Sequence, residues 1–290
     1  PLLLFCLFGM MLFAASNALI LMFVALEIFS LPLYLLTGLS RRRRLVSQEA
    51  SVKYFLLGAL SSAIFLYGIA LVYGAAGSFQ LGIIAQASVT QISGSKIFAA
   101  GMILLAVGLL FKVGAVPFHN WTPDVYTGAP SPVTAFMSIA TKMVAVLGLM
   151  RVMYVALGAM RWDWQLLLAV VAVASMAVGA IVGLSQTDMK RMLAYSSIAH
   201  AGFIMVGVVG AYTLQTGQRP DQTGSVSSVL IYLAGYGLAT IGFFMVILMV
   251  RKAGGGSTEI DSRAGLGRRH PMLGALIVLF MLSFAGIPAT

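Results

Sequence analysis

Four ionisable side chains are notable because each lies near the middle of a long apolar segment: Glu27, Lys112, Lys142 and His200. A lysine or carboxylate at the centre of a bilayer costs roughly 2.5–3.5 kcal/mol even on the mild insertion scale. Such groups must therefore face the protein interior, where they are paired or hydrated. Glutamate, lysine and histidine can each gain and lose a proton, so this pattern predicts a proton relay.

Buried lysine suits this chemistry, because removal from water disfavours its charged form and a nearby carboxylate favours that form again. Glu27 and Lys112 are therefore expected to act as one charge pair, with Lys142 receiving the proton. The alternative is a structural ion pair. Lys53 and Arg151 lie nearer helix ends, where a cation reaches the membrane interface more easily. His200 also fits a neutral core histidine.

The composition places the segments that carry these groups in a membrane. Hydrophobic residues make up 60% of the 290 residues and charged residues only 9%, whereas a soluble domain carries about 25% charged residues. The net charge of +10 then indicates cytoplasmic loops, because lysine and arginine collect there in membrane proteins. Basic patches interleaved with aromatic residues are absent, so nucleic acid is not an expected partner.

The sequence offers no ligand set for a metal or cofactor. Its single cysteine, Cys6, cannot support an iron–sulfur cluster, which takes about four cysteines. The three histidines, His119, His200 and His270, lack metal-ligand spacing, and no glycine-rich phosphate loop follows a strand. Any redox cofactor is therefore expected in other chains.

Apolar segments of about 20 residues predict an all-α, polytopic membrane helix bundle. The nine expected spans are about 1–17, 18–39, 51–73, 97–126, 131–156, 163–184, 192–213, 226–250 and 271–290.

Charge in the loops supports this number of spans. Eleven cationic residues fall in the loops of one side and three in those of the other. This bias predicts that the Arg41–Arg44 loop faces the cytoplasm. The loops of the first side are 41–44, 185–191 and 251–270, and those of the second are 74–96, 157–162 and 213–225.

Two of the spans are expected to be discontinuous. Gly114 and Pro117 interrupt segment 97–126, and Pro288 follows Gly286 near the end of the chain. Broken backbone at membrane depth is tolerated where it is buried in protein or lines a wet cavity. Two breaks in corresponding places indicate a transporter with inverted repeats. The expected halves are 1–156, with about five helices, and 163–290, with about four.

The residues around the first break resemble a known family. The run KVGAVPFHNWTPDVYTGAPSPVTAF at 112–136 is similar to the signature of the antiporter-like N subunits (subunit 2) of proton-translocating NADH–quinone oxidoreductase, complex I. The likeness covers nearly the whole chain, and the TPDVYTGAP core is its most specific part. Further similar stretches are ALEIFSLPLYLLTGLS at 25–40, EASVKYFLLGALSSAIFLYGIAL at 49–71, QTDMKRMLAYSSIAHAGF at 186–203 and EIDSRAGLGRRHP at 259–271.

The resemblance implies roles for particular residues. Glu27 and Lys112 match the family's glutamate–lysine pair, Lys142 its central lysine, and Lys53 a further lysine at a helix start. The family also carries an ionisable residue beyond the later GIP break, and this chain ends at Thr290, before that position. We therefore expect a fragment that lacks both ends of such a subunit.

The resemblance also implies a setting. NADH, FMN, iron–sulfur clusters and quinone would belong to partner subunits, with this chain in the bacterial inner membrane beside other membrane subunits of the complex. Two alternatives stay open. One is a redox-independent, Mrp-like cation/proton antiporter subunit, because such subunits share the general pattern. The other is a passive assembly scaffold.

Overall fold

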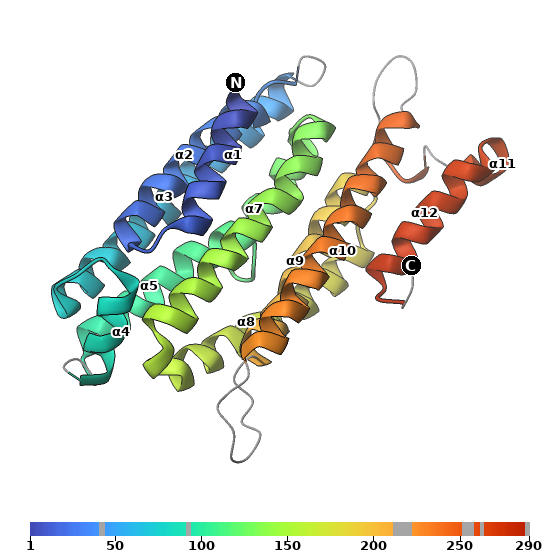
Figure 1. The fold of residues 1–290 in the computed structure, drawn as a ribbon. Coiled ribbons are helices and arrows are strands. Elements are labelled where there is room, and N and C mark those ends of the chain that lie inside the picture. Colours follow the sequence, from blue (N-terminus) through green and yellow to red (C-terminus); the bar gives the residue numbers. More distant parts are fainter. Residues whose placement is uncertain (41–43, 91–93, 211–221, 251–257, 262–263, 288–290) are drawn as a thin grey trace.

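The fold of the chain is a bundle of membrane-length helices (Figure 1). We describe it from a computed structural model, which covers all residues except 41–43, 91–93, 211–221, 251–257, 262–263 and 288–290. Seven described helices are long and apolar enough to cross a membrane, and two shorter apolar helices, α1 and α12, accompany them. The helices are α1 (Leu2–Ala15), α2 (Leu19–Thr37), α3 (Arg44–Ala76), α4 (Leu81–Thr90), α5 (Lys96–Val113), α6 (Trp121–Gly128), α7 (Ser131–Arg151), α8 (Arg161–Leu184), α9 (Met189–Gly210), α10 (Gln222–Met249), α11 (Leu266–Arg269) and α12 (Pro271–Phe284).

Seven of the nine expected spans contain a helix of membrane length, and the first and last contain the shorter helices α1 and α12. Three features of the segments between them differ from those expected. Helix α3 begins at Arg44, so Lys53 lies within the helix and not at its start. Helix α9 begins at Met189, which places Lys190 and Arg191 in a helix where a loop was expected. The loop expected over 74–96 contains the short helix α4.

The expected break in segment 97–126 is confirmed. Helix α5 ends at Val113, and a second helix, α6, begins at Trp121. Gly114 adopts φ +78°, a left-handed conformation that glycine reaches without steric cost, and it ends α5. At the other expected break, α12 ends at Phe284 and Gly286 has φ +77°. Pro288 lies outside the described residues.

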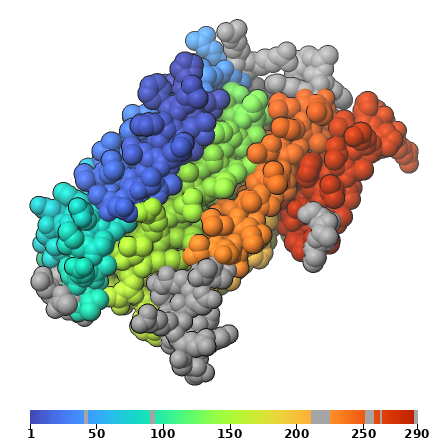
Figure 2. All heavy atoms as spheres, in the orientation of Figure 1, coloured from blue at the N-terminus to red at the C-terminus, as the bar shows by residue number. Residues whose placement is uncertain are grey.

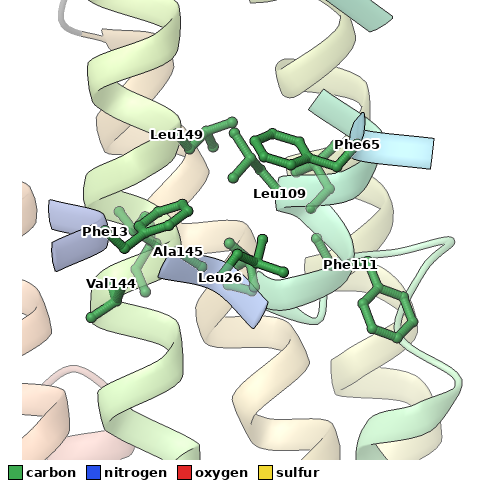
Figure 3. Packing of buried hydrophobic residues seen from close by; sticks show 14 of the residues in the cluster. Phe13, Leu26, Phe65, Leu109, Phe111, Val144, Ala145 and Leu149 are labelled. Atoms are coloured by element: carbon green, nitrogen blue, oxygen red, sulfur yellow. The ribbon is translucent and has the colours of Figure 1, made fainter. Parts of the chain in front are cut away.

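A continuous apolar core joins α1, α2, α3, α5 and α7 (Figure 3). Phe13 of α1, Leu26 of α2, Phe65 of α3 and Leu109 of α5 are all 1% exposed or less. Side chains from α7, including Leu149, complete this layer. The core therefore fixes α2, α5 and α7 relative to one another, and these are the helices that carry Glu27, Lys112 and Lys142.

Glycines allow helices α3 and α5 to approach each other closely. A Cβ added at Gly68 of α3 would lie 2.8 Å from the backbone nitrogen of Leu105, and one added at Gly101 of α5 would lie 2.8 Å from Val72 Cγ2. Both distances are shorter than a carbon atom tolerates. Small residues at such interfaces are the usual means by which membrane helices come into contact.

The outer surface of the helices is apolar. Leucine, isoleucine and phenylalanine side chains are exposed along the bundle, among them Leu4 at 70%, Ile181 at 69% and Leu238 at 73%. Helix α12 has no buried residue and stands at one edge of the bundle (Figure 2). Such a surface fits lipid or neighbouring membrane chains and not water, so the chain is a multi-pass membrane protein.

The fold predicts on which side of the membrane two exposed positions lie. Helix α3 spans 33 residues, about 50 Å at 1.5 Å per residue. The start of α3 and the start of α5 lie at opposite ends of the bundle (Figure 1). Gln48 lies near the first of these helix starts and Lys96 at the second. Gln48→Cys and Lys96→Cys, each in a Cys6→Ser background, should react with an impermeant thiol reagent from opposite faces of membrane vesicles. Reaction of both from the same face would contradict the arrangement.

Candidate functional site

Lys112 lies in the last turn of α5, immediately before the helix break, and is 2% exposed. Its ammonium nitrogen donates to Ser30 Oγ at 2.8 Å and to Tyr34 Oη at 3.3 Å, both on α2. Ser30 Oγ in turn donates to the Leu26 carbonyl at 2.5 Å. The lysine is therefore held by neutral hydroxyl oxygens inside the bundle.

Aromatic rings enclose the same ammonium group. Lys112 Nζ lies 5.5 Å from the ring centroid of Tyr34 and 5.8 Å from that of Phe29. Ring faces attract cations, and the attraction grows when water is excluded. Gly58 of α3 lies against the Tyr34 hydroxyl, where a Cβ would overlap it. This glycine therefore keeps the hydroxyl in reach of Lys112.

Glu27 lies on α2 one turn before Ser30 and is half-buried. Its carboxyl oxygen Oε1 is buried and accepts no hydrogen bond from the protein. The expected direct pair with Lys112 is not formed, since no ion pair within 4.0 Å joins these two described residues. Glu27 still interacts with Lys112 through space. Ser30 and Tyr34 take the hydrogen bonds that a closer carboxylate would take.

Lys142 forms a second buried site, on α7. It is 3% exposed, and its Nζ donates to Ser197 of α9 twice: to Oγ at 2.6 Å and to the backbone carbonyl. The ring centroid of Tyr236 on α10 lies 5.6 Å from the same nitrogen. Lys142 therefore has its own partners on α9 and α10, separate from those of Lys112 on α2.

His200 lies one turn beyond Ser197 on α9 and is 6% exposed. Its Nδ1 is 2.6 Å from Tyr232 Oη, and its ring centroid is 4.5 Å from that of Tyr236. Tyr236 therefore lies between Lys142 and His200, so the structure brings these two sequence-predicted residues together.

The helix break is held by specific polar contacts. Trp121 Nε1 donates to the Phe111 carbonyl at 2.9 Å, and the Val116 backbone N–H donates to Ser175 Oγ of α8 at 2.9 Å. Thr122 Oγ1 and His119 Nδ1 are buried at the break with no partner in the protein. Buried polar atoms without protein partners are the places where ordered water binds. The expectation of a wet break is therefore compatible with this geometry.

A row of aromatic side chains runs from the Lys112 site to the Lys142 site. The rings of Tyr34 and Tyr54 are 4.8 Å apart, and those of Tyr54 and Trp121 are stacked at 4.8 Å. The Trp121 ring is 6.5 Å from that of Tyr126, whose hydroxyl lies 3.5 Å from Ser197 Oγ. The second half of the broken helix thus links both lysine sites.

Lys53 lies in a different environment. It is about half-exposed and pairs with Glu49 at 2.7 Å and with Asp124 of α6 at 3.0 Å. Arg191 of α9 pairs with the second oxygen of Asp124 at 3.1 Å. With Val46, Ala50 and Thr127, these residues surround a cavity of about 190 Å³. The structure does not bring Lys53 together with Lys112 or Lys142.

Lys190 is a buried cation that the sequence analysis placed in a loop. It is 4% exposed, and its Nζ donates to the Ala129 carbonyl at the end of α6, at 2.7 Å. Pro130 follows Ala129 and prevents α6 from continuing. The sequence offered one signal for this burial, because Lys190 lies directly before a long apolar segment. Arg151, expected near the interface, donates to the Ala14 carbonyl at 2.7 Å and to Asn17, at the end of α1.

No cluster of three or more potential metal ligands occurs within the described ranges. The two lysine sites are built from ammonium, hydroxyl and carbonyl groups. Each site combines a lysine with hydroxyl groups that both donate and accept hydrogen bonds. Such an arrangement can hold a proton and pass it on.

The chain matches the family described as "NADH:quinone oxidoreductase/Mrp antiporter, TM" over residues 16–290. It is 73% identical over 290 residues to NADH-quinone oxidoreductase subunit N of Cutibacterium acnes, and 54% identical to that of Rhodococcus opacus. These matches cover 100% of this chain and 54% and 52% of the two relatives. The chain thus spans about half the length of the curated relatives it matches.

Solved structures show the same fold. A chain of respiratory complex I from Thermus thermophilus is 40% identical with a TM-score of 0.80, over 99% of this chain and 59% of that one. A chain of the Mrp complex from Dietzia sp. is 24% identical with a TM-score of 0.86, over 99% of this chain and 51% of that one. The second likeness concerns the fold alone.

The contacts at the two ends of α6 predict unequal contributions to stability. Lys190→Met deprives the buried Ala129 carbonyl of a charged donor, at a cost of about 1–3 kcal/mol. Asp124→Asn weakens two partly exposed ion pairs, which contribute about 0–1 kcal/mol each. In detergent micelles, Lys190→Met should lower the thermal unfolding midpoint more than Asp124→Asn. The reverse order would show that the exposed pairs hold α6 in place.

Proposed function

Because the chain belongs to the NADH:quinone oxidoreductase/Mrp antiporter transmembrane family, we propose that it is part of a proton-translocating subunit of NADH–quinone oxidoreductase. In this proposal the buried lysines relay protons, and the redox chemistry takes place in partner subunits. The observation that carries the proposal is the pair of enclosed ammonium groups, Lys112 and Lys142, each bonded only to neutral oxygens in the described residues.

The identity to curated relatives supports complex I over an Mrp-like antiporter. The fold is common to both kinds of complex, so it does not discriminate between them. The 73% identity is to a subunit N of NADH-quinone oxidoreductase. A passive scaffold would not require buried lysines, which are costly in a membrane protein.

The geometry supports a switch at Lys112. Its ammonium is bonded to Ser30 and Tyr34, while Glu27 has a free oxygen one helical turn away on α2. Approach of the carboxylate would stabilise the charged lysine, and its withdrawal or protonation would favour proton release. The proton would then pass towards Lys142 by way of water at the helix break, where Thr122 Oγ1 and His119 Nδ1 are buried without partners in the protein. His200, beyond Tyr236, would take part in the next transfer.

The setting is part of the same proposal. The chain would contact other membrane subunits of complex I and the lipid bilayer, without nucleic acid. It would hold no redox cofactor, leaving NADH, FMN, iron–sulfur clusters and quinone to partner subunits. The bacterial relatives support a location in the inner membrane. The excess of cationic residues at one end supports a cytoplasmic position for the Arg41–Arg44 loop.

A double-mutant cycle tests whether Glu27 and Lys112 act as one unit. Glu27→Gln and Lys112→Ala should each allow assembly yet remove much of the NADH-driven proton uptake by membrane vesicles, normalised to assembled complex. The double variant should lose little more than either single variant, because interacting partners have non-additive effects.

Lys96→Ala is the matched control, because Lys96 lies at the exposed start of the same helix as Lys112. It should leave proton uptake near that of the unmodified complex. Small, additive losses for Glu27→Gln and Lys112→Ala would leave a structural role for these residues and overturn the relay.

A further inference from the structure

The Lys142 site contains no carboxylate partner. The ion pairs of the described residues involve Lys53 and Arg191 but not Lys142. Its ammonium group is 3% exposed and donates to two oxygens of one residue, Ser197. A buried charge needs such hydrogen bonds to offset its removal from water. The protonation of Lys142 therefore depends on Ser197 more than on any other described side chain.

The Ser197 hydroxyl differs from those helical hydroxyls that bond within their own helix. Ser30, Thr37 and Thr240 each donate to the backbone carbonyl four residues earlier in their own helix, which is the usual local partner. Ser197 Oγ instead faces Lys142 of α7 and Tyr126 of α6. Its side chain is thus directed across helices.

One tyrosine meets this hydroxyl, and a second lies against the lysine. Tyr126 Oη of α6 lies 3.5 Å from Ser197 Oγ, and the ring centroid of Tyr236 on α10 lies 5.6 Å from Lys142 Nζ. A serine hydroxyl has one proton to donate and accepts through its lone pairs. While Lys142 is an ammonium, Ser197 Oγ accepts from it and donates to one tyrosine. When Lys142 is a neutral amine, Ser197 can donate to it instead.

We propose that Ser197 is a positioning residue that couples the protonation of Lys142 to the broken helix through Tyr126. The proposal rests on the proposed proton relay and names the junction between its two lysine sites. Its hydroxyl reverses the direction of donation when Lys142 changes charge. The proton state of Lys142 is thereby linked to α6, while α10 contacts the same lysine through the Tyr236 ring.

Other ionisable groups surround Lys142, but most belong to neighbouring sites. Tyr236 adjoins it through the ring contact, and His200 lies beyond Tyr236, with 4.5 Å between those two ring centroids. The ionisable residues on the elements that pack against α7 or bond to Lys142 are Cys6 of α1, Glu27 and Tyr34 of α2, Lys96 and Lys112 of α5, Asp124 and Tyr126 of α6, Tyr154 after α7, Lys190, Arg191, Tyr195 and His200 of α9, and Tyr232 and Tyr236 of α10.

The test is the pH dependence of NADH-driven proton uptake by vesicles that carry the complete complex. Ser197→Ala removes one of the two oxygens that hold the Lys142 ammonium and leaves the backbone carbonyl. The alkaline limit of proton uptake should fall by about one pH unit, a tenfold change in proton affinity. Ser197→Thr keeps the hydroxyl and should retain the unmodified profile.

Two further variants keep the test decisive. Ser88→Ala, at a buried serine that bonds within its own helix, should not move the profile. If Ser197→Ala fails to assemble, Ser197→Cys, a weaker acceptor of similar size, should show the same shift. An unmoved profile for Ser197→Ala or Ser197→Cys, or an equal shift for Ser197→Thr, would overturn the inference. Non-additivity between Glu27→Gln and Lys112→Ala would persist in that case, so the two failures are distinguishable.

Discussion

The cost of burying a lysine ammonium in an apolar bundle governs the rest of this structure. Lys112 and Lys142 are each at most 3% exposed, and each is held by hydroxyl or carbonyl oxygens on a neighbouring helix. Those oxygens must be placed within hydrogen-bonding distance, because an uncompensated charge at membrane depth costs several kcal/mol. Helix α3 packs against both α2 and α5, and α6 and α10 each pack against both α7 and α9, and this arrangement supplies that placement.

The broken helix places polar backbone and side-chain groups near the two buried lysines. Val113 ends α5 directly after Lys112, and α6 carries Tyr126 towards Ser197. A continuous helix would bury its backbone groups in internal hydrogen bonds and leave the region between the lysines apolar. The break instead leaves polar atoms such as Thr122 Oγ1 facing inward. The helix break therefore supplies polar groups in the region between the two buried lysines.

The sequence predicted the helical class, the break at Gly114 and the buried lysines, because each follows from local hydrophobicity, proline placement or the cost of a charge in lipid. It did not predict that Glu27 would stand apart from Lys112, nor that Lys190 would be buried against Ala129. Both facts depend on which helices pack together and on hydroxyl partners supplied from distant segments. A helical hydroxyl such as Ser197 gives no local signal, since its usual partner lies in its own helix.

The central claim is that the buried lysines act by gaining and losing protons and not only by carrying charge. Arginine separates these roles, because its guanidinium keeps a positive charge and does not release its proton. The measurement is NADH-driven proton uptake per assembled complex for Lys112→Arg and Lys142→Arg. The account predicts that both variants assemble and lose most of the uptake. Uptake equal to that of the unmodified complex in either variant would contradict proton transfer through that lysine.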